Sequence, residues 1–286
     1  MTDAQCGFVF ATSGADYTVL ARRAARTIRK VMPETAIDLF TDQMVTDPIF
    51  SQVHLLEKQG FHRPKMEAMR RTRFKKTVLL DADVLILAEV NELFEILEHV
   101  DIAAALGVNK TKDFLPKLHG LPRSVPVYNT GVIAFRKRPE IGSLARAWQA
   151  EIVAKKLKTD QGTFRKLIWE SDLRMLPLPY EYNFMKLNFL WEWNLHMGAP
   201  RILHAASLHQ KPPGDPATAY TLDEVLPAQL VRHVETLLAS EWKLQGDHAV
   251  PPGRTPGQRN RMPRGRLHKA KTFVRSLRTK MFDQKV

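Results

Sequence analysis

Apolar residues in the first 136 positions form short unbroken runs that alternate with amphipathic stretches. The unbroken runs predict buried strands at 6–12, 36–41, 77–83, 101–106 and 130–135, and a weaker run predicts one at 53–57. In the stretch 16–31 apolar residues recur every three or four positions, which predicts a helix, and a basic helix is predicted at 65–74. Apolar strands that alternate with helices indicate an α/β domain with a mostly parallel sheet flanked by helices.

The second half of the chain has a less regular pattern. It predicts helices at 141–156 and 161–169 and a short strand at 201–203. Asn91 is placed to cap a short helix, and Thr221 with Glu224 matches a capping box that opens a later helix. Parallel sheets bind ligands beyond the carboxyl ends of their strands, so the residues at those ends are the candidates for chemistry.

The formal net charge of +13 is concentrated near the C-terminus. Residues 251–286 contain 11 of the 43 Lys and Arg residues and one of the 30 Asp and Glu residues, which gives this segment +10 and the preceding 250 residues +3. The body is therefore nearly balanced, which excludes a histone-like composition. A hydrophobic content of 44% is sufficient for a globular core. The one cysteine, Cys6, excludes an intrachain disulfide and a thiolate metal cluster.

Two carboxylates close the most apolar of the predicted strands. Asp81 and Asp83 are two residues apart in the segment TVLLDADVLIL, so on a continuous strand they would point to the same face of the sheet. Carboxylate oxygens at the carboxyl edge of a parallel sheet suit Mg²⁺ or Mn²⁺. A divalent ion there would neutralise a diphosphate and stabilise its departure.

The segment LLDADVLIL resembles the Asp-x-Asp motif of nucleotide-diphospho-sugar glycosyltransferases of the GT-A fold. The order of the other motifs is most similar to glycosyltransferase family 8, which includes glycogenin and lipooligosaccharide galactosyltransferases. This resemblance spans about residues 5–213. It implies a Rossmann-like GT-A domain, a UDP-sugar donor, Mn²⁺ or Mg²⁺ as cofactor and retention of anomeric configuration. The acceptor would be a glycan, a lipid-linked molecule or a protein.

The segment FATSGADY resembles the first strand and loop that hold the nucleotide in this family. The resemblance assigns backbone contacts to Ala11 and Thr12, contact with the base or ribose to Asp16, and stacking to Tyr17. An ordinary strand end followed by a helix start is the alternative. The turn after this strand lacks Gly-x-Gly-x-x-Gly, which argues against a Rossmann oxidoreductase.

Further segments follow in the family's order. Lys65 corresponds to a basic residue near the diphosphate or sugar, although a solvated helix face is an equal alternative. Asn129 and Gly131 lie in a segment similar to the family's Asn-Ser/Thr-Gly, which touches the donor sugar. An ordinary turn is the alternative there, and close backbone approach is a reason for a glycine.

The pair Asp160 and Gln161 resembles the family's Asp-Gln segment beside the anomeric carbon. The resemblance implies that Asp160 binds sugar hydroxyls and that Gln161 faces the developing oxocarbenium ion. The alternative is structural, because Thr159 or Asp160 is also placed to cap the following helix.

A segment with His204 and Lys211 resembles the family's C-terminal His…Gly…Lys-Pro-Trp element. There the histidine is the third metal ligand and the lysine binds the diphosphate. In this chain the interval is one residue longer, the glycine is missing and Pro213 replaces the tryptophan. His209 is therefore a second candidate for the metal ligand.

These motifs divide the chain into a glycosyltransferase domain at 1–245, a Pro/Gly linker at 246–258 and a basic amphipathic tail at 259–286. In the tail, apolar residues recur every three or four positions between basic ones, which is typical of helices that lie on anionic membranes. The N-terminus lacks the basic segment of a signal peptide, and no run of about 18 apolar residues could span a membrane. We expect a cytoplasmic protein attached peripherally to the cytoplasmic membrane face.

Two other functions fit part of this pattern. A phosphatase of the haloacid dehalogenase type also has Asp-x-Asp after an apolar strand, but there the motif opens the domain and is followed by a threonine where Leu85 stands here. A non-enzymatic membrane- or RNA-binding protein would use only the basic tail. No nucleic-acid-binding module accompanies that charge, so nucleic acid is not an expected partner.

Overall fold

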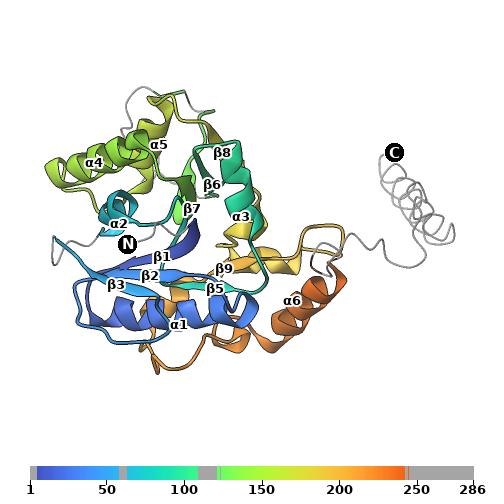
Figure 1. Cartoon of the computed structure of the whole chain (residues 1–286). Helices are drawn as coiled ribbons and strands as arrows, with labels where there is room; N and C mark the ends of the chain where they lie inside the picture. Colours follow the sequence, from blue (N-terminus) through green and yellow to red (C-terminus); the bar gives the residue numbers. More distant parts are fainter. Residues whose placement is uncertain (1–4, 58–62, 109–120, 123, 242–243, 245–286) are drawn as a thin grey trace, which may run out of the picture. The chain divides into compact units, whose positions relative to one another are not determined.

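The computed structural model describes residues 5–57, 63–108, 121–122, 124–241 and 244 (Figure 1). The strands are β1 Cys6–Thr12, β2 Ile37–Thr41, β3 Gln52–Leu55, β4 Lys76–Leu80, β5 Val84–Ile86, β6 Ile102–Leu106, β7 Tyr128–Arg136, β8 Met175–Leu178 and β9 Ile202–His204. The helices are α1 Ala15–Val31, α2 Lys65–Arg71, α3 Glu92–Glu95, α4 Pro139–Ala154, α5 Gln161–Trp169 and α6 Ala228–Ser240.

Seven of these strands form one sheet in the order β3-β2-β1-β4-β7-β6-β8. β1 pairs in parallel with β2 and β4, β2 with β3, and β6 with β8, whereas β7 runs antiparallel to its neighbours β4 and β6. The prediction of a mostly parallel α/β sheet is therefore confirmed. β5 and β9 form a separate antiparallel pair.

The strands are apolar on both faces because helices cover both faces. Phe8, Phe10 and Leu80 point into a core that also contains residues of α1, α3, α6, β5 and β9. Val9 and Leu79 point the other way, into a core with α2, α4 and α5 (Figure 1). Alternate residues of one strand thus enter different cores, which explains why the strands have no polar face in the sequence.

Three local predictions were wrong in detail. The strand predicted at 77–83 ends at Leu80, and a turn separates it from β5. Asn91 precedes α3, but its side chain makes no capping hydrogen bond. The capping box of Thr221 and Glu224 is present, but it opens the 3₁₀ helix Leu222–Glu224, and α6 begins later, after Pro227.

The predicted linker and basic tail lie outside the described residues, so both remain predictions. In the part of the chain that the structure describes, no helix is long and apolar enough to cross a membrane.

Asp101, at the start of β6, is a buried carboxylate surrounded by arginines. Its Oδ1 accepts hydrogen bonds from Arg136 at 2.8 Å and Arg138 at 2.6 Å, and its Oδ2 accepts one from the backbone N–H of Arg174 at 3.0 Å. Burial alone would raise the pKa of this carboxyl. The hydrogen bonds outweigh burial and lower the pKa from 3.8 to about 2.

A pKa that is lower in the folded than in the unfolded state stabilises the fold above the unfolded pKa. We therefore expect the contribution of Asp101 to be present at neutral pH and to be lost as the pH falls from about 4 to about 2. Urea unfolding of the wild type and of Asp101→Asn over a pH series measures this contribution. The difference in unfolding free energy should shrink below about pH 4. A difference that is equally large at neutral pH and at about pH 2 would contradict this account.

Candidate active site

The turn between β4 and β5 carries the two aspartates. The backbone N–H of Asp81 donates to the carbonyl of Gly131 at 2.8 Å, which extends the β4–β7 pairing by one residue. Val84 then pairs with His204 in the antiparallel β5–β9 pair, so Asp83 lies beside this histidine. Ligand atoms of Asp81, Asp83 and His204 lie within 4.8 Å of one another. The aspartates thus converge through a turn and not, as predicted, through the pleat of one strand.

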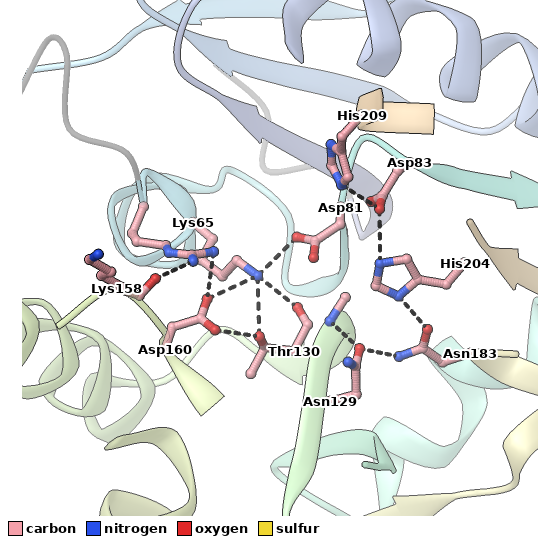
Figure 2. A network of polar contacts seen from close by, with 12 residues as sticks. Lys65, Asp81, Asp83, Asn129, Thr130, Lys158, Asp160, Asn183, His204 and His209 are labelled. Atoms are coloured by element: carbon pink, nitrogen blue, oxygen red, sulfur yellow. Dashed lines mark hydrogen bonds and ion pairs between the residues drawn. The ribbon is translucent and has the colours of Figure 1, made fainter. Parts of the chain in front are cut away.

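Asp83 is an almost fully buried carboxylate at the centre of this cluster (Figure 2). Its Oδ2 lies 3.2 Å from His204 Nε2 and 2.7 Å from His209 Nε2. Its Oδ1 has no hydrogen-bond partner among the described residues. Burial alone would raise the pKa of Asp83, but the two imidazoles outweigh it and hold this pKa well below its usual range.

The donor set fits a divalent cation. Two carboxylates and one imidazole are suitable ligands for Mn²⁺ or Mg²⁺, and the orphaned Oδ1 of Asp83 is a buried acceptor that a bound ion would satisfy. The pKa values of both histidines are raised. Burial opposes the shift at His204, where the Asp83 charge outweighs it, and the hydrogen bond to Asp83 is the largest cause at His209.

The two candidate histidines differ in position. His204 is mostly buried and lies near both carboxylates, whereas His209 is more exposed and reaches only Oδ2 of Asp83. His209 belongs to the 3₁₀ helix Ala206–Gln210, and its ring lies 5.1 Å from that of Tyr17. The geometry favours His204 as the metal ligand and places His209 between Asp83 and Tyr17.

Lys65 is a buried cation that joins the aspartate turn to α5. Its Nζ lies 2.9 Å from Asp81 Oδ1 and 3.3 Å from Asp160 Oδ2, and it donates to the carbonyl of Thr130 at 3.0 Å (Figure 2). Burial would lower the pKa of Lys65, but the charges of Asp160 and Asp81 outweigh it and raise that pKa. Lys65 therefore stays charged, and the alternative of a solvated helix face is wrong.

Asp160 precedes α5, but its side chain does not cap the helix. Its carboxylate faces Lys65 and accepts a hydrogen bond from Thr130 Oγ1 at 3.2 Å. Burial would raise the pKa of Asp160, and the positive charges of Lys65 and Arg63 lower it instead. Gln161 is the first residue of α5 and is half-buried. The capping alternative for the Asp160 side chain is therefore wrong.

Asn129 and Gly131 lie on β7, close to His204 and Asn183. A Cβ atom on Gly131 would lie 2.4 Å from Cε1 of His204, so the glycine makes room for the imidazole ring. Asn129 Oδ1 accepts hydrogen bonds from the backbone N–H of Gly131 at 2.9 Å and from Nδ2 of Asn183 at 2.6 Å.

Asn183 was missed by the sequence analysis. Its side chain is fully buried and lies 2.9 Å from His204 Nδ1. No local pattern marks it, because it stands in the aromatic segment YEYNF, which predicts packing.

Five of the predicted nucleotide-binding residues lie outside the aspartate turn: four at the end of β1 and the start of α1, and Lys211 directly after the 3₁₀ helix Ala206–Gln210. Ala11 and Thr12 end β1, Asp16 is exposed in the first turn of α1, and half-exposed Tyr17 reaches the cluster through His209. Lys211 is exposed, and its Nζ donates to the carbonyl of Glu224 at 2.6 Å. The Lys211 amine thus contacts the backbone of Glu224, outside the cluster of Asp81, Asp83 and His204.

Comparisons with solved structures give several matches. The galactosyltransferase LgtC, solved with donor and acceptor sugar analogs, matches with a TM-score of 0.54 and 13% identity over 86% of this chain and 98% of its own. The glycosyltransferase GlyE of Streptococcus pneumoniae matches with a TM-score of 0.51 and 18% identity over 82% of this chain and 63% of its own. The bifunctional glycosyltransferase WbbM matches with a TM-score of 0.51 and 15% identity over 72% of this chain and 46% of its own. The chain has the fold of these glycosyltransferases.

The GT-A fold implied by the sequence resemblance is thereby confirmed. No protein-family model and no curated protein sequence matches the chain. At these low identities the likeness establishes the fold, so the reaction has to be inferred from the residues of the site.

Removal of Lys65 should destabilise the protein, because Asp160 would be left as a buried charge without its main partner. We expect Lys65→Met to lower the unfolding free energy by about 3–5 kcal/mol. The double variant Lys65→Met/Asp160→Asn should recover most of that loss. Urea unfolding measures both.

Lys155→Met is the matched control, because Lys155 forms an exposed pair with Glu151 on α4 that contributes less than about 1 kcal/mol. A Lys65→Met variant as stable as the Lys155→Met control would show that Lys65 does not hold the cluster together.

Proposed function

We propose that the protein is a metal-dependent glycosyltransferase that moves a sugar from a nucleotide-diphospho-sugar, a UDP-sugar, to a glycan, lipid-linked or protein acceptor with retention of configuration. One observation carries the proposal. A buried carboxylate with an orphaned oxygen, Asp83, lies together with Asp81 and His204 on a fold shared with glycosyltransferases. The donor, the retention and the acceptor class rest on the family resemblance of the motifs.

The charge of the cluster supports a requirement for a divalent cation. The carboxylates of Asp81, Asp83 and Asp160 face one lysine, Lys65, whose amine is already shared between Asp81 and Asp160. Arg63 lies 3.7 Å from Asp160 and adds one positive charge, so with neutral imidazoles the formal charge is −1, which does not attract a diphosphate. A bound Mn²⁺ or Mg²⁺ would neutralise the leaving diphosphate as a Lewis acid.

The chain's own groups have separate tasks in this proposal. Asp81, Asp83 and His204 hold the cation, and Tyr17 offers a half-exposed ring for the nucleotide base beside His209. Asp160, positioned by Lys65, presents its carboxylate edge to sugar hydroxyls, and Gln161 lies next to it at the start of α5. Lys65 fixes the distance between the cation site and the sugar site, because its Nζ contacts one aspartate of each.

The haloacid dehalogenase alternative is not favoured. In that class the motif opens the domain, whereas here it follows β4, and the fold matches are to glycosyltransferases.

Asp83→Asn tests the proposal because it keeps the shape of the side chain and removes its charge. We expect the wild type to hydrolyse or transfer the sugar of one UDP-sugar in Mn²⁺ and to lose this activity in chelator. In Asp83→Asn the rate should fall by at least about 100-fold, the effect of removing one charge-stabilising group from an active site. A panel of UDP- and GDP-sugars with and without Mn²⁺, assayed by product formation and thermal shift, identifies the donor.

Asp172→Asn is the matched control, because it makes the same change at an exposed position and should leave the rate unchanged. Full activity of Asp83→Asn, or equal activity in Mn²⁺ and in chelator, would contradict the metal-dependent reaction.

A further inference from the structure

We infer that Asn183 is a positioning residue for the metal site: a relay from the Gly131 backbone through Asn129 and Asn183 holds His204 with its proton on Nδ1, so that Nε2 faces the cation. The inference rests on the proposed metal site and adds a residue that no motif marked. It assigns Asn129 to the relay as well. The family resemblance had assigned Asn129 to the donor sugar.

The direction of every hydrogen bond in the relay follows from its first donor. A backbone N–H can only donate, so the atom of Asn129 that lies 2.9 Å from the nitrogen of Gly131 is its carbonyl oxygen. The atom of Asn183 that lies 2.6 Å from this oxygen must donate, so it is the amide nitrogen. The remaining amide atom of Asn183 is then an oxygen, and it accepts from Nδ1–H of His204 at 2.9 Å. One backbone group thereby decides which atom of Asn183 faces the imidazole of His204.

The opposite tautomer would be costly at this place. An unprotonated Nδ1 would face the oxygen of Asn183, which sets two acceptors against each other. Asn183 is 0% exposed and Asn129 is 2% exposed, so water cannot supply the missing proton donor. Nδ1 of His204 therefore carries a proton, and Nε2, which lies 3.2 Å from Asp83, is the nitrogen that faces the cation site.

Backbone hydrogen bonds position the segments that carry Asn183 and His204, the two partners of the last hydrogen bond in the relay. Phe184, next to Asn183, donates its N–H to the carbonyl of Ile202 at 2.8 Å and accepts from the N–H of His204 at 3.0 Å. The imidazole ring also has no room to move toward β7, because it lies against Gly131. Such partners of a metal-binding histidine orient the ring and typically change metal affinity 10–100-fold.

Two variants of Asn183 separate the hydrogen bond from the packing. Asn183→Leu has a similar size but offers no acceptor, so we expect Mn²⁺ affinity to fall by about 10–100-fold. Asn183→Asp keeps an acceptor for Nδ1–H, so its Mn²⁺ affinity should stay within a few-fold of wild type. Its buried charge and the lost hydrogen bond to Asn129 lower the melting temperature. Calorimetric or electron paramagnetic resonance titration gives the affinity, and thermal unfolding gives the stability. Equal Mn²⁺ affinity of Asn183→Leu and wild type would overturn the inference.

The proton on Nδ1 can be observed without metal. In the metal-free wild type with ¹⁵N-labelled histidine, we expect Nδ1 of His204 to be protonated, whether or not Nε2 shares a proton with Asp83. The His204 resonances are those missing from His204→Asn. An unprotonated Nδ1 would overturn the relay even if both variants failed to fold.

This readout also separates the relay from the proposed function. If the wild type binds no Mn²⁺, the proposed function fails, and the ¹⁵N spectrum still decides whether the relay exists.

Discussion

The buried negative charge of Asp83 is the constraint on which the rest of the site depends. A carboxylate in this position is costly unless positive charge or hydrogen-bond donors compensate it, and two imidazoles converge on one of its oxygens while the other has no partner in the described part of the chain. The same requirement explains why Lys65 is buried, because it compensates Asp160 and Asp81. A divalent cation would complete this compensation and would bring the donor to the same place.

The sheet brings these groups together from distant parts of the sequence. β7 lies antiparallel to β4 and places Gly131 opposite Asp81, and the small β5–β9 sheet places His204 beside Asp83. Lys65 then connects this edge to α5 through Asp160. Asp81 and His204 are thus each held by backbone pairing and by a buried polar contact of the side chain, which favours a preorganised site.

The sequence alone predicted much of the fold. Continuous apolar runs predicted β1, β2, β4, β6 and β7, because both faces of the sheet are covered, and the helical period predicted α1 to within a residue. The end of β4 could not be predicted, since Ala82 and the apolar β5 continue the pattern through the turn. The antiparallel direction of β7 also has no local signal, because it depends on how the connection before it crosses the sheet.

The motifs predicted Asp81, Asp83, His204, Lys65 and Asp160, and the structure brings these five residues together. They could be found because they stand in segments that resemble the family's motifs and follow in the family's order. Asn183 could not be found, because its importance depends on a contact with His204, 21 residues away, and not on its neighbours in the sequence. Lys211 fits the motif, but its amine contacts Glu224, which is consistent with the altered spacing and missing glycine of that element.

The central claim is that Asp81, Asp83 and His204 bind the cation that holds the donor. Anomalous scattering at the manganese edge, from crystals of the protein grown with Mn²⁺ and UDP, tests it most directly. The account predicts one strong peak in contact with an oxygen of each aspartate, with Nε2 of His204 and with the diphosphate. A diphosphate bound without a peak at this position, or a peak whose ligands exclude Asp83, would contradict it.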